Sequence, residues 1–318
     1  MDHFHFISFI FLLVNVSFAG NVHAALLPAQ TYWKSVFPNT PMPKSLQILL
    51  NPSPSSENKI ILAEMVHSNT KVIDFLGIYS HYQINPSSNT KPQKSDKDAE
   101  ADGKAIFFLE NQLRPGRTLK VNEIFKTRNK ASFLPRQIAE SIPFSSRKFP
   151  EIFKYFSLEP KSNEASLIKE TIRNCEIPDM KGEQRYCATS LESLIDWTVS
   201  KLGKNIQVLS NNVEKETENR VFAIAGEAKK VGETEMVCHK LKYAYAVFLC
   251  HSIEKTTAYT VPLVSADGST KAKILAICHK DTSAWSPDHI AFQILKVKPG
   301  TVPICHFLTK ETLVWVPK

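Results

Sequence analysis

Met236-Val237-Cys238-His239 and Phe248-Leu249-Cys250-His251 are short apolar stretches that each end on an adjacent cysteine and histidine. The same ending recurs in Ala276-Ile277-Cys278-His279 and in Pro303-Ile304-Cys305-His306. Each stretch predicts a β-strand, on which the side chains of neighbouring residues point to opposite faces. If the four strands lie near each other, one face therefore gathers four thiols and the other gathers four imidazoles.

The intervals between these Cys-His pairs form a pattern of their own. Ten residues separate His239 from Cys250, twenty-six separate His251 from Cys278, and twenty-five separate His279 from Cys305. Eight residues separate His306 from Trp315. This arrangement resembles the BURP family, which is confined to plants and has four Cys-His pairs at such intervals, followed by a tryptophan. The resemblance covers roughly residues 105 to 317 and includes the opening Phe107-Phe108-Leu109-Glu110.

The N-terminal part of the chain differs in composition from the rest. The apolar run Phe6 to Phe18, followed by Val22-His23-Ala24, predicts a signal peptide over residues 1–24. Residues 25–50 contain Tyr32-Trp33 and several prolines, and we expect them to form a short ordered or docking segment, similar to that of the seed-protein and dehydration-responsive branches of the family. Residues 51–104 are rich in Ser, Pro, Asn and Lys and predict a disordered linker, interrupted by an aromatic island at 75–82.

The signal peptide places the chain in the secretory pathway, with the apoplast or cell wall as destination and a storage vacuole as the alternative. An even number of cysteines in an oxidising compartment favours disulfides. Cys175 and Cys187 have no following histidine and flank a predicted turn between two helices, so a local disulfide is expected, contributing about 2–3 kcal/mol. The remaining four, Cys238, Cys250, Cys278 and Cys305, are expected to pair among themselves in an order that the sequence leaves open.

Two interpretations of the four paired histidines stay open. They either hold a metal or are hydrogen-bonded side chains that lie beside structural disulfides. Imidazole without thiolate suits Cu(II), Ni(II) or Zn(II), and Cu(II) has the highest affinity of these; a zinc finger is disfavoured because the chain lacks a C-x2–4-C knuckle. The family resemblance implies copper, with His239, His251, His279 and His306 as ligands. His289 is expected at the surface or in a turn, and Asp281 and Asp288 are candidate hydrogen-bond partners of the imidazoles.

For the fold we expect an α+β protein, with short helices followed by an antiparallel β sandwich or barrel, the BURP domain, over residues 105–318. One helix is predicted over residues 163–174. A second begins at a capping box formed by Thr189 and Glu192 and ends at Gly203. From residue 205 onward, β-rich runs predict strands at 206–209, 244–250, 256–264, 272–278, 290–297 and 313–316.

Composition and motifs limit the classes of function. The chain is 43% hydrophobic, which is typical of a globular protein, and its formal net charge of +8 indicates a solvated basic surface or attraction to acidic wall polysaccharide. Neither nucleic acid nor a membrane is an expected partner, and P-loop, GxGxxG and HExxH motifs are absent. We therefore expect a secreted plant protein that binds copper, has a role in seed development or stress response, and associates with wall or vacuolar matrix components.

The family resemblance also implies an enzymatic alternative. Some BURP proteins are copper-dependent peptide cyclases that oxidise Tyr or Trp in a core peptide, often in their own N-terminal region. Residues 75–82 would be that core peptide here, with Tyr79 and Tyr82 as the candidate crosslink sites. The alternative function is thus autocatalytic oxidative macrocyclisation.

Overall fold

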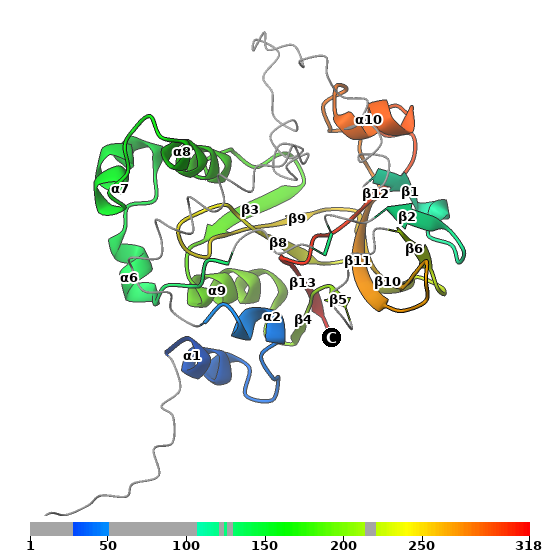
Figure 1. Ribbon diagram of the computed structural model, residues 1–318, viewed down its shortest axis with the longest axis horizontal. Helices are drawn as coiled ribbons and strands as arrows, with labels where there is room; N and C mark the ends of the chain where they lie inside the picture. Colours follow the sequence, from blue (N-terminus) through cyan, green and yellow to red (C-terminus); the bar gives the residue numbers. More distant parts are fainter. Residues whose placement is uncertain (1–27, 51–106, 121–123, 126–129, 214–220) are drawn as a thin grey trace, which may run out of the picture.

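The structure, a computed structural model, describes residues 28–50, 107–120, 124–125, 130–213 and 221–318. The predicted signal peptide and the predicted linker, with Tyr79 and Tyr82, lie outside the described residues. Short helices precede most of the strands, and all the described strands belong to two antiparallel sheets (Figure 1). The expected α+β fold is therefore confirmed.

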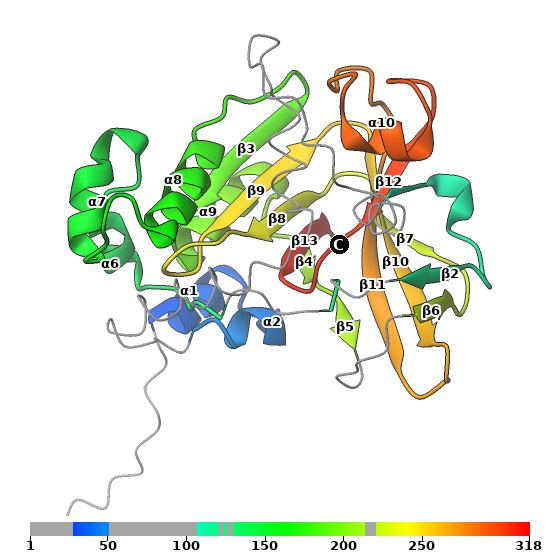
Figure 2. The ribbon, with the colours of Figure 1, turned by 45° about the horizontal axis from the view of Figure 1, so that its top comes forward.

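The two sheets, here called sheet A and sheet B, face each other in the C-terminal half (Figure 2). Sheet A has the order β1-β12-β11-β10-β6-β2, with β5 paired to β11 and β7 paired to β10. Its strands are β1 (Phe107–Leu109), β2 (Thr118–Lys120), β5 (Asn212–Val213), β6 (Val221–Ile224), β7 (Lys229–Gly232), β10 (Thr256–Ser265), β11 (Lys271–His279) and β12 (Ile304–Phe307). Sheet B has the order β3-β9-β8-β13-β4, with strands β3 (Glu183–Ala188), β4 (Ile206–Leu209), β8 (Met236–Lys240), β9 (Phe248–Ile253) and β13 (Thr312–Pro317).

An apolar layer joins the two sheets. Val237 and Val314 of sheet B form one buried cluster with Leu275 and Ile277 of sheet A. The chain passes from sheet B to sheet A between β9 and β10, which are only two residues apart. The inner faces of β8, β9, β11 and β12, on which the histidines lie, are consequently held against each other.

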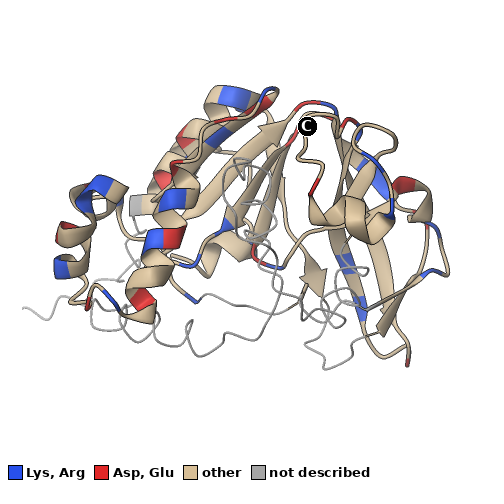
Figure 3. Cartoon of the chain, turned by 90° about the horizontal axis from the view of Figure 1, so that it is seen from above, with Lys and Arg blue, Asp and Glu red and all other residues tan. Residues whose placement is uncertain are grey.

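Most of the helices cover the other face of sheet B, whereas the helix at Ile290–Leu295 packs against β1 and β12 of sheet A. They are α1 (Pro28–Val36), α2 (Lys44–Gln47), α6 (Arg136–Ser141), α7 (Phe149–Tyr155), α8 (Asn163–Cys175), α9 (Leu191–Leu202) and α10 (Ile290–Leu295), with single 3-10 turns at Glu110–Gln112 and Ser146–Lys148. Figure 3 shows Lys and Arg interspersed with Asp and Glu along these helices. Among the described residues, no helix has both the length and the apolar character needed to cross a membrane.

Helix α8 matches the predicted helix at 163–174, and α9 is confirmed with a different start. Its N-cap is Ser190, whose hydroxyl accepts a hydrogen bond from the Ser193 amide at 3.1 Å, while the Ser193 hydroxyl accepts one from the Ser190 amide. The predicted capping box at Thr189 and Glu192 is therefore one residue too early. Gly203 follows the helix with φ of 75°, a conformation that glycine adopts without strain, as predicted.

One predicted strand is wrong, and the one predicted at 244–250 begins too early, since β9 starts at Phe248. Residues 290–295 form α10, because a short apolar run cannot by itself distinguish a buried strand from a buried helix. Residues 244–247 form a buried loop before β9, where the Ala246 amide donates to the Ser132 carbonyl and packing against α7 and α8 replaces strand pairing. The segment between α8 and α9 is likewise more than a turn, because Cys187 lies within β3.

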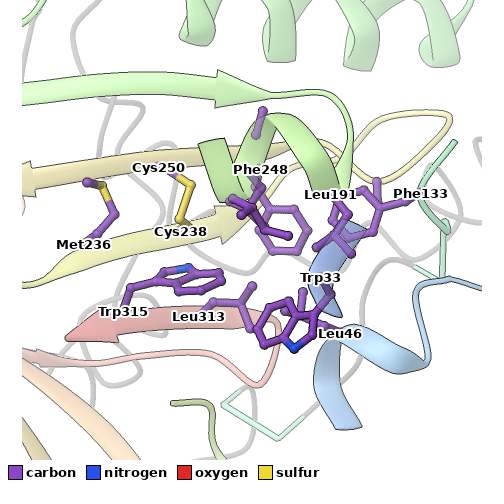
Figure 4. Close-up of a cluster of buried hydrophobic side chains, with 14 of the residues drawn as sticks. Trp33, Leu46, Phe133, Leu191, Met236, Cys238, Phe248, Cys250, Leu313 and Trp315 are labelled. Carbon is purple, nitrogen blue, oxygen red and sulfur yellow. A yellow bond between two sulfur atoms is a disulfide. The ribbon is translucent and has the colours of Figure 1, made fainter. Parts of the chain in front are cut away.

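The N-terminal segment, residues 28–50, packs on sheet B. Trp33 of α1 lies 6.1 Å from Trp315 of β13, measured between ring centroids, and Leu46 of α2 is fully buried in the same cluster (Figure 4). The Leu49 carbonyl accepts a hydrogen bond from the Phe133 amide at 2.7 Å. Residues 28–50 thus complete the core on the helical side of sheet B.

Candidate functional site

Two disulfides link strands that are direct neighbours. Cys238 of β8 lies opposite Cys250 of β9 and is bonded to it, and Cys278 of β11 is bonded to Cys305 of β12 in the same way. The Cys238–Cys250 bond packs beside Trp315 on the helical side of sheet B (Figure 4), while Cys278 and Cys305 are buried with Phe307 in the core of sheet A. This settles the pairing that the sequence left open.

The third disulfide joins Cys175, at the end of α8, to Cys187 of β3. This is the local bond expected from the sequence. All six cysteines are therefore oxidised and none lies free. A metal bound to this protein consequently has no thiolate available as a ligand.

The four histidines that follow these cysteines point to the opposite faces of their strands, as strand alternation predicts. Because Cys238 and Cys250 are in register, His239 and His251 occupy diagonal positions across β8 and β9, within reach of long or aromatic side chains. Their Nε2 atoms lie 3.4 Å apart. His279 and His306 repeat this geometry on β11 and β12, with 3.3 Å between the Nε2 atoms.

Both histidine pairs line one small cavity between the sheets. The sequence placed all four imidazoles on one face, whereas the structure brings together the inner faces of two sheets. The cavity volume is about 10 Å³, roughly the room that one water molecule requires. Its walls are formed by Glu235, Val237, His239, His251, Ser252, Ile253, Thr256, Ile277, His279 and His306.

A partner at each Nδ1 atom orients each imidazole. Nδ1 lies 3.4 Å from the Thr312 hydroxyl in His239 and 3.4 Å from the Thr256 hydroxyl in His279. In His251 it lies 3.3 Å from the Glu183 carboxylate, and in His306 it lies 3.4 Å from the Phe307 carbonyl. Contacts of this kind fix the ring orientation of metal-binding histidines in proteins and leave Nε2 to face the ion.

The sequence did not identify these partners. Asp281, a candidate, instead accepts hydrogen bonds from Lys255 and Ser283, and Asp288 is exposed. Thr256 lies directly opposite His279, and Thr312 opposite His239, but strand register is invisible in a single sequence. Glu183 comes from β3, which the sequence analysis treated as part of a turn.

Burial makes the four imidazoles neutral at physiological pH. Desolvation, with a smaller contribution from His306, lowers the pKa of His239 and His251 to about 3, and it lowers the pKa of His306 to about 4. Burial also takes the pKa of His279 well below its ordinary value. Neutral imidazole is the form that binds a metal, so the site is ready to accept a cation without first losing protons from histidine.

The donor set and its spacing fit a metal ion in part. Two nitrogens that bind one tetrahedral ion at 2.0–2.1 Å lie roughly 3.3 Å from each other, which is close to the separation within each pair. However, no group of three or more His, Cys, Asp or Glu side chains in the described ranges is already arranged to hold an ion. The structure therefore presents two two-nitrogen sets on the walls of one cavity.

His289 differs from expectation. It is fully buried rather than at the surface, and its Nδ1 accepts the Ala291 amide at 3.1 Å and so caps α10. Its ring packs 4.7 Å from Trp285, which in turn lies 5.0 Å from the His279 ring, both measured between centroids. His289 thus supports the wall behind His279.

Comparisons with known proteins agree with the disulfide and histidine pattern. A sequence model of the BURP domain matches residues 106–317. BURP domain protein RD22 of Arabidopsis thaliana is 48% identical over 217 residues, which are 66% of this chain and 55% of that protein. BURP domain-containing protein 5 of Oryza sativa subsp. japonica is 37% identical over 309 residues, covering 95% of this chain and 90% of the relative.

A wheat relative, Protein RAFTIN 1B of Triticum aestivum, is 28% identical over 342 residues, covering 95% of this chain and 94% of that protein. The chain spans about half the length of RD22 and of BURP domain-containing protein 3 of rice, at 55% and 50%. The family match and the relatives agree with the two disulfide-bonded strand pairs that carry the histidines. This chain therefore belongs to the BURP-domain family of plant proteins.

Proposed function

We propose that this chain is a secreted BURP-domain protein that binds copper through His239, His251, His279 and His306, with a role in seed development or stress response. The observation that carries the proposal is the convergence of two oriented Nε2 pairs on one cavity. The four side chains are between 2% and 7% exposed, so this convergence is not a feature of a solvated surface. The two Nε2 atoms of each pair lie within hydrogen-bonding distance of each other, and a bound ion would replace that contact with two metal–nitrogen bonds.

The chemistry of the donors favours copper among the divalent metals. Imidazole suits Cu(II), Ni(II) and Zn(II), and Cu(II) has the highest affinity of the three. A free thiol beside Cu(II) would be oxidised, but every cysteine here is already in a disulfide. Because the cysteines are already oxidised, bound Cu(II) would have no thiol to oxidise. The two cross-strand disulfides also hold the strands in the register that makes the histidines diagonal neighbours.

A second candidate function is oxidative cyclisation of a core peptide. It is supported by Phe107, whose ring lies 6.1 Å from the His306 ring, measured between centroids. Tyr82 precedes Phe107 by 25 residues in the sequence (107 − 82), a length of chain that is sufficient to bring the candidate core peptide at 75–82 to the cavity. When bound, copper would supply, with dioxygen as the terminal acceptor, the oxidising power to remove two hydrogens from such a peptide.

Localisation and partners follow from the same proposal. We place the protein in the apoplast or cell wall, with a storage vacuole as the alternative. Matrix components of those compartments and the protein's own core peptide would be its partners. The net charge of +8 supports contact with acidic polysaccharide.

Copper titration of the purified chain tests the proposed function. The wild type is expected to bind copper stoichiometrically in the presence of a competing chelator. The double variant His239→Ala with His279→Ala removes one donor from each pair and should lose that binding, while its circular dichroism spectrum shows that it is folded. Unchanged binding in the folded double variant would exclude the histidine site.

Mass analysis of the 70–90 segment after incubation with Cu(II) and oxygen tests the cyclase alternative. Loss of two hydrogens within residues 75–82 is expected if the chain acts on itself. Tyr79→Phe and Tyr82→Phe then identify the ring that reacts. An unmodified segment in copper-loaded protein rules out reaction in cis.

A further inference from the structure

Glu235 lies on the wall of the histidine cavity and has no role in the site described above. Its side chain is only 5% exposed. Both carboxyl oxygens are buried, and neither has a hydrogen-bond partner among the described residues. The other buried glutamate of this site, Glu183, has its Oε1 atom 3.3 Å from Nδ1 of His251, although that oxygen also has no hydrogen bond among the described residues.

Glu235 immediately precedes β8 and lies on the histidine side of sheet B. Glu235, Val237 and His239 follow each other at intervals of two residues, and all three line the cavity. Met236 and Cys238, between them, pack in the hydrophobic cluster on the opposite face. The carboxyl group is therefore directed to the same side of the strand as the imidazoles.

Glu235 lies just before the residues of β8 that pair with β9. The register begins at Val237, which lies opposite His251, so His239 is a diagonal neighbour of His251 and Glu235 precedes Val237 by two residues. His239 uses its position to bring Nε2 within 3.4 Å of His251. Glu235 lines the same cavity as the four histidines and adds one carboxyl group to its wall.

An unpartnered carboxyl is costly in this place. Removing an ionised carboxylate from water without a compensating partner costs several kcal/mol, so such groups are normally paired or neutralised. Desolvation, reinforced by the charge of Glu233, raises the pKa of Glu235 to about 8. The imidazoles offer no compensating charge because burial keeps them neutral, and Glu183 is itself acidic. A dication in the cavity would supply the missing positive charge.

We propose that Glu235 is a further residue of the metal site, whose carboxylate faces the imidazole-held divalent cation, directly or through one water, and neutralises one of its two charges. The inference rests on the proposed function, because it requires a cation at the histidines. It adds an oxygen donor to a site otherwise made of nitrogen. It also explains why an acidic side chain without a hydrogen-bond partner is kept inside the sheet interface.

The test compares Glu235→Gln with Glu233→Gln by competitive Cu(II) titration. Both changes remove one carboxyl and keep the side-chain shape, but the Glu233 side chain is 65% exposed and forms an ion pair with Lys230. The Glu235→Gln variant should bind copper at least tenfold more weakly than the wild type, and Glu233→Gln should differ by less than twofold. Equal affinity of Glu235→Gln and wild type would overturn the inference.

The wild type provides a measurement that does not depend on a variant. Infrared difference spectra recorded at pH 6, before and after copper addition, should show loss of a protonated-carboxyl band as Glu235 ionises against the cation. Retention of that band would also overturn the inference. If instead the wild type binds no copper, the proposed function itself fails, so the two failures are distinguishable.

Discussion

Acidification from pH 7.5 to 5.5 should destabilise the metal-free protein, because four imidazoles must stay neutral in the fold. In the unfolded chain each histidine takes up a proton with a pKa of 6.5, whereas in the fold the pKa of His239 and His251 is about 3 and that of His306 about 4. The contribution of a neutral buried histidine to the free energy of unfolding is greatest above pH 6.5 and declines as the pH falls below 6.5. Over this interval each histidine costs about 1.4 kcal/mol, or about 5 kcal/mol for the four.

Glu235 acts in the opposite direction. Its pKa is raised to about 8 in the fold, so its contribution to stability is largest at low pH and is lost as the pH rises toward 8. Acidification from pH 7.5 to 5.5 therefore increases the contribution of Glu235 to the free energy of unfolding by about 2–3 kcal/mol. Together with the histidines, this gives a net loss of about 3 kcal/mol in the wild type. Burial also raises the pKa of Glu183, so this carboxyl opposes the loss in the same direction.

Urea unfolding of metal-free protein at the two pH values measures the difference. We expect a wild-type loss of about 3 kcal/mol and a loss of about 5 kcal/mol in Glu235→Gln, in which the opposing contribution is absent. The carboxylates whose pKa is lowered, such as Glu110, titrate below this window and contribute little. A free energy of unfolding that is the same at both pH values, in wild type and variant alike, would refute the burial of neutral imidazoles.

Three further predictions concern the supports of the site. Replacing Cys278 and Cys305 by serine should lower the free energy of unfolding by about 3–4 kcal/mol on the loop-entropy model. The loss should be greater than for the same change at Cys238 and Cys250, because the sequence separation is 27 rather than 12. Equal losses in chemical denaturation would contradict the model. Thr256→Val and Thr312→Val should each weaken copper binding by roughly 10- to 100-fold, because each removes the partner that orients an imidazole through Nδ1. The control is Ser283→Ala, at an exposed site. Copper affinities equal to that of the control would argue against orientation through Nδ1. Trp33→Ala should cost about 3–5 kcal/mol, since Trp33 is 3% exposed and packs on Trp315; a thermal midpoint like that of the wild type would show that residues 28–50 do not contribute to the core.

The sequence predicts much of this fold because its strongest signals are local. Alternation along a strand separates each cysteine from its histidine, and the structure keeps that separation at all four pairs. Helix α8 and the glycine stop of α9 follow from periodicity and from the conformational freedom of Gly203. The apolar run at 290–295 fits both the two-residue period of a strand and the period of a helix. Only tertiary packing decides between the two, and here it gives a helix.

Long-range pairing explains what the sequence does not predict. Which cysteines bond depends on the neighbours β8–β9 and β11–β12, and the meeting of the two histidine pairs depends on how sheet A lies against sheet B. Thr256, Thr312 and Glu183 become partners of the imidazoles only through that pairing. One signal was available, however: Glu235, Val237 and His239 alternate along the chain, which places a carboxyl on the histidine face.

Electron paramagnetic resonance of the protein loaded with one equivalent of Cu(II) tests the central claim most directly, because it reports the atoms bound to the metal. The account predicts hyperfine couplings from imidazole nitrogens, with no sulfur contribution, and their loss in the folded His239→Ala, His279→Ala double variant. Identical spectra for wild type and double variant, or a copper signal without imidazole nitrogen coupling, would contradict it.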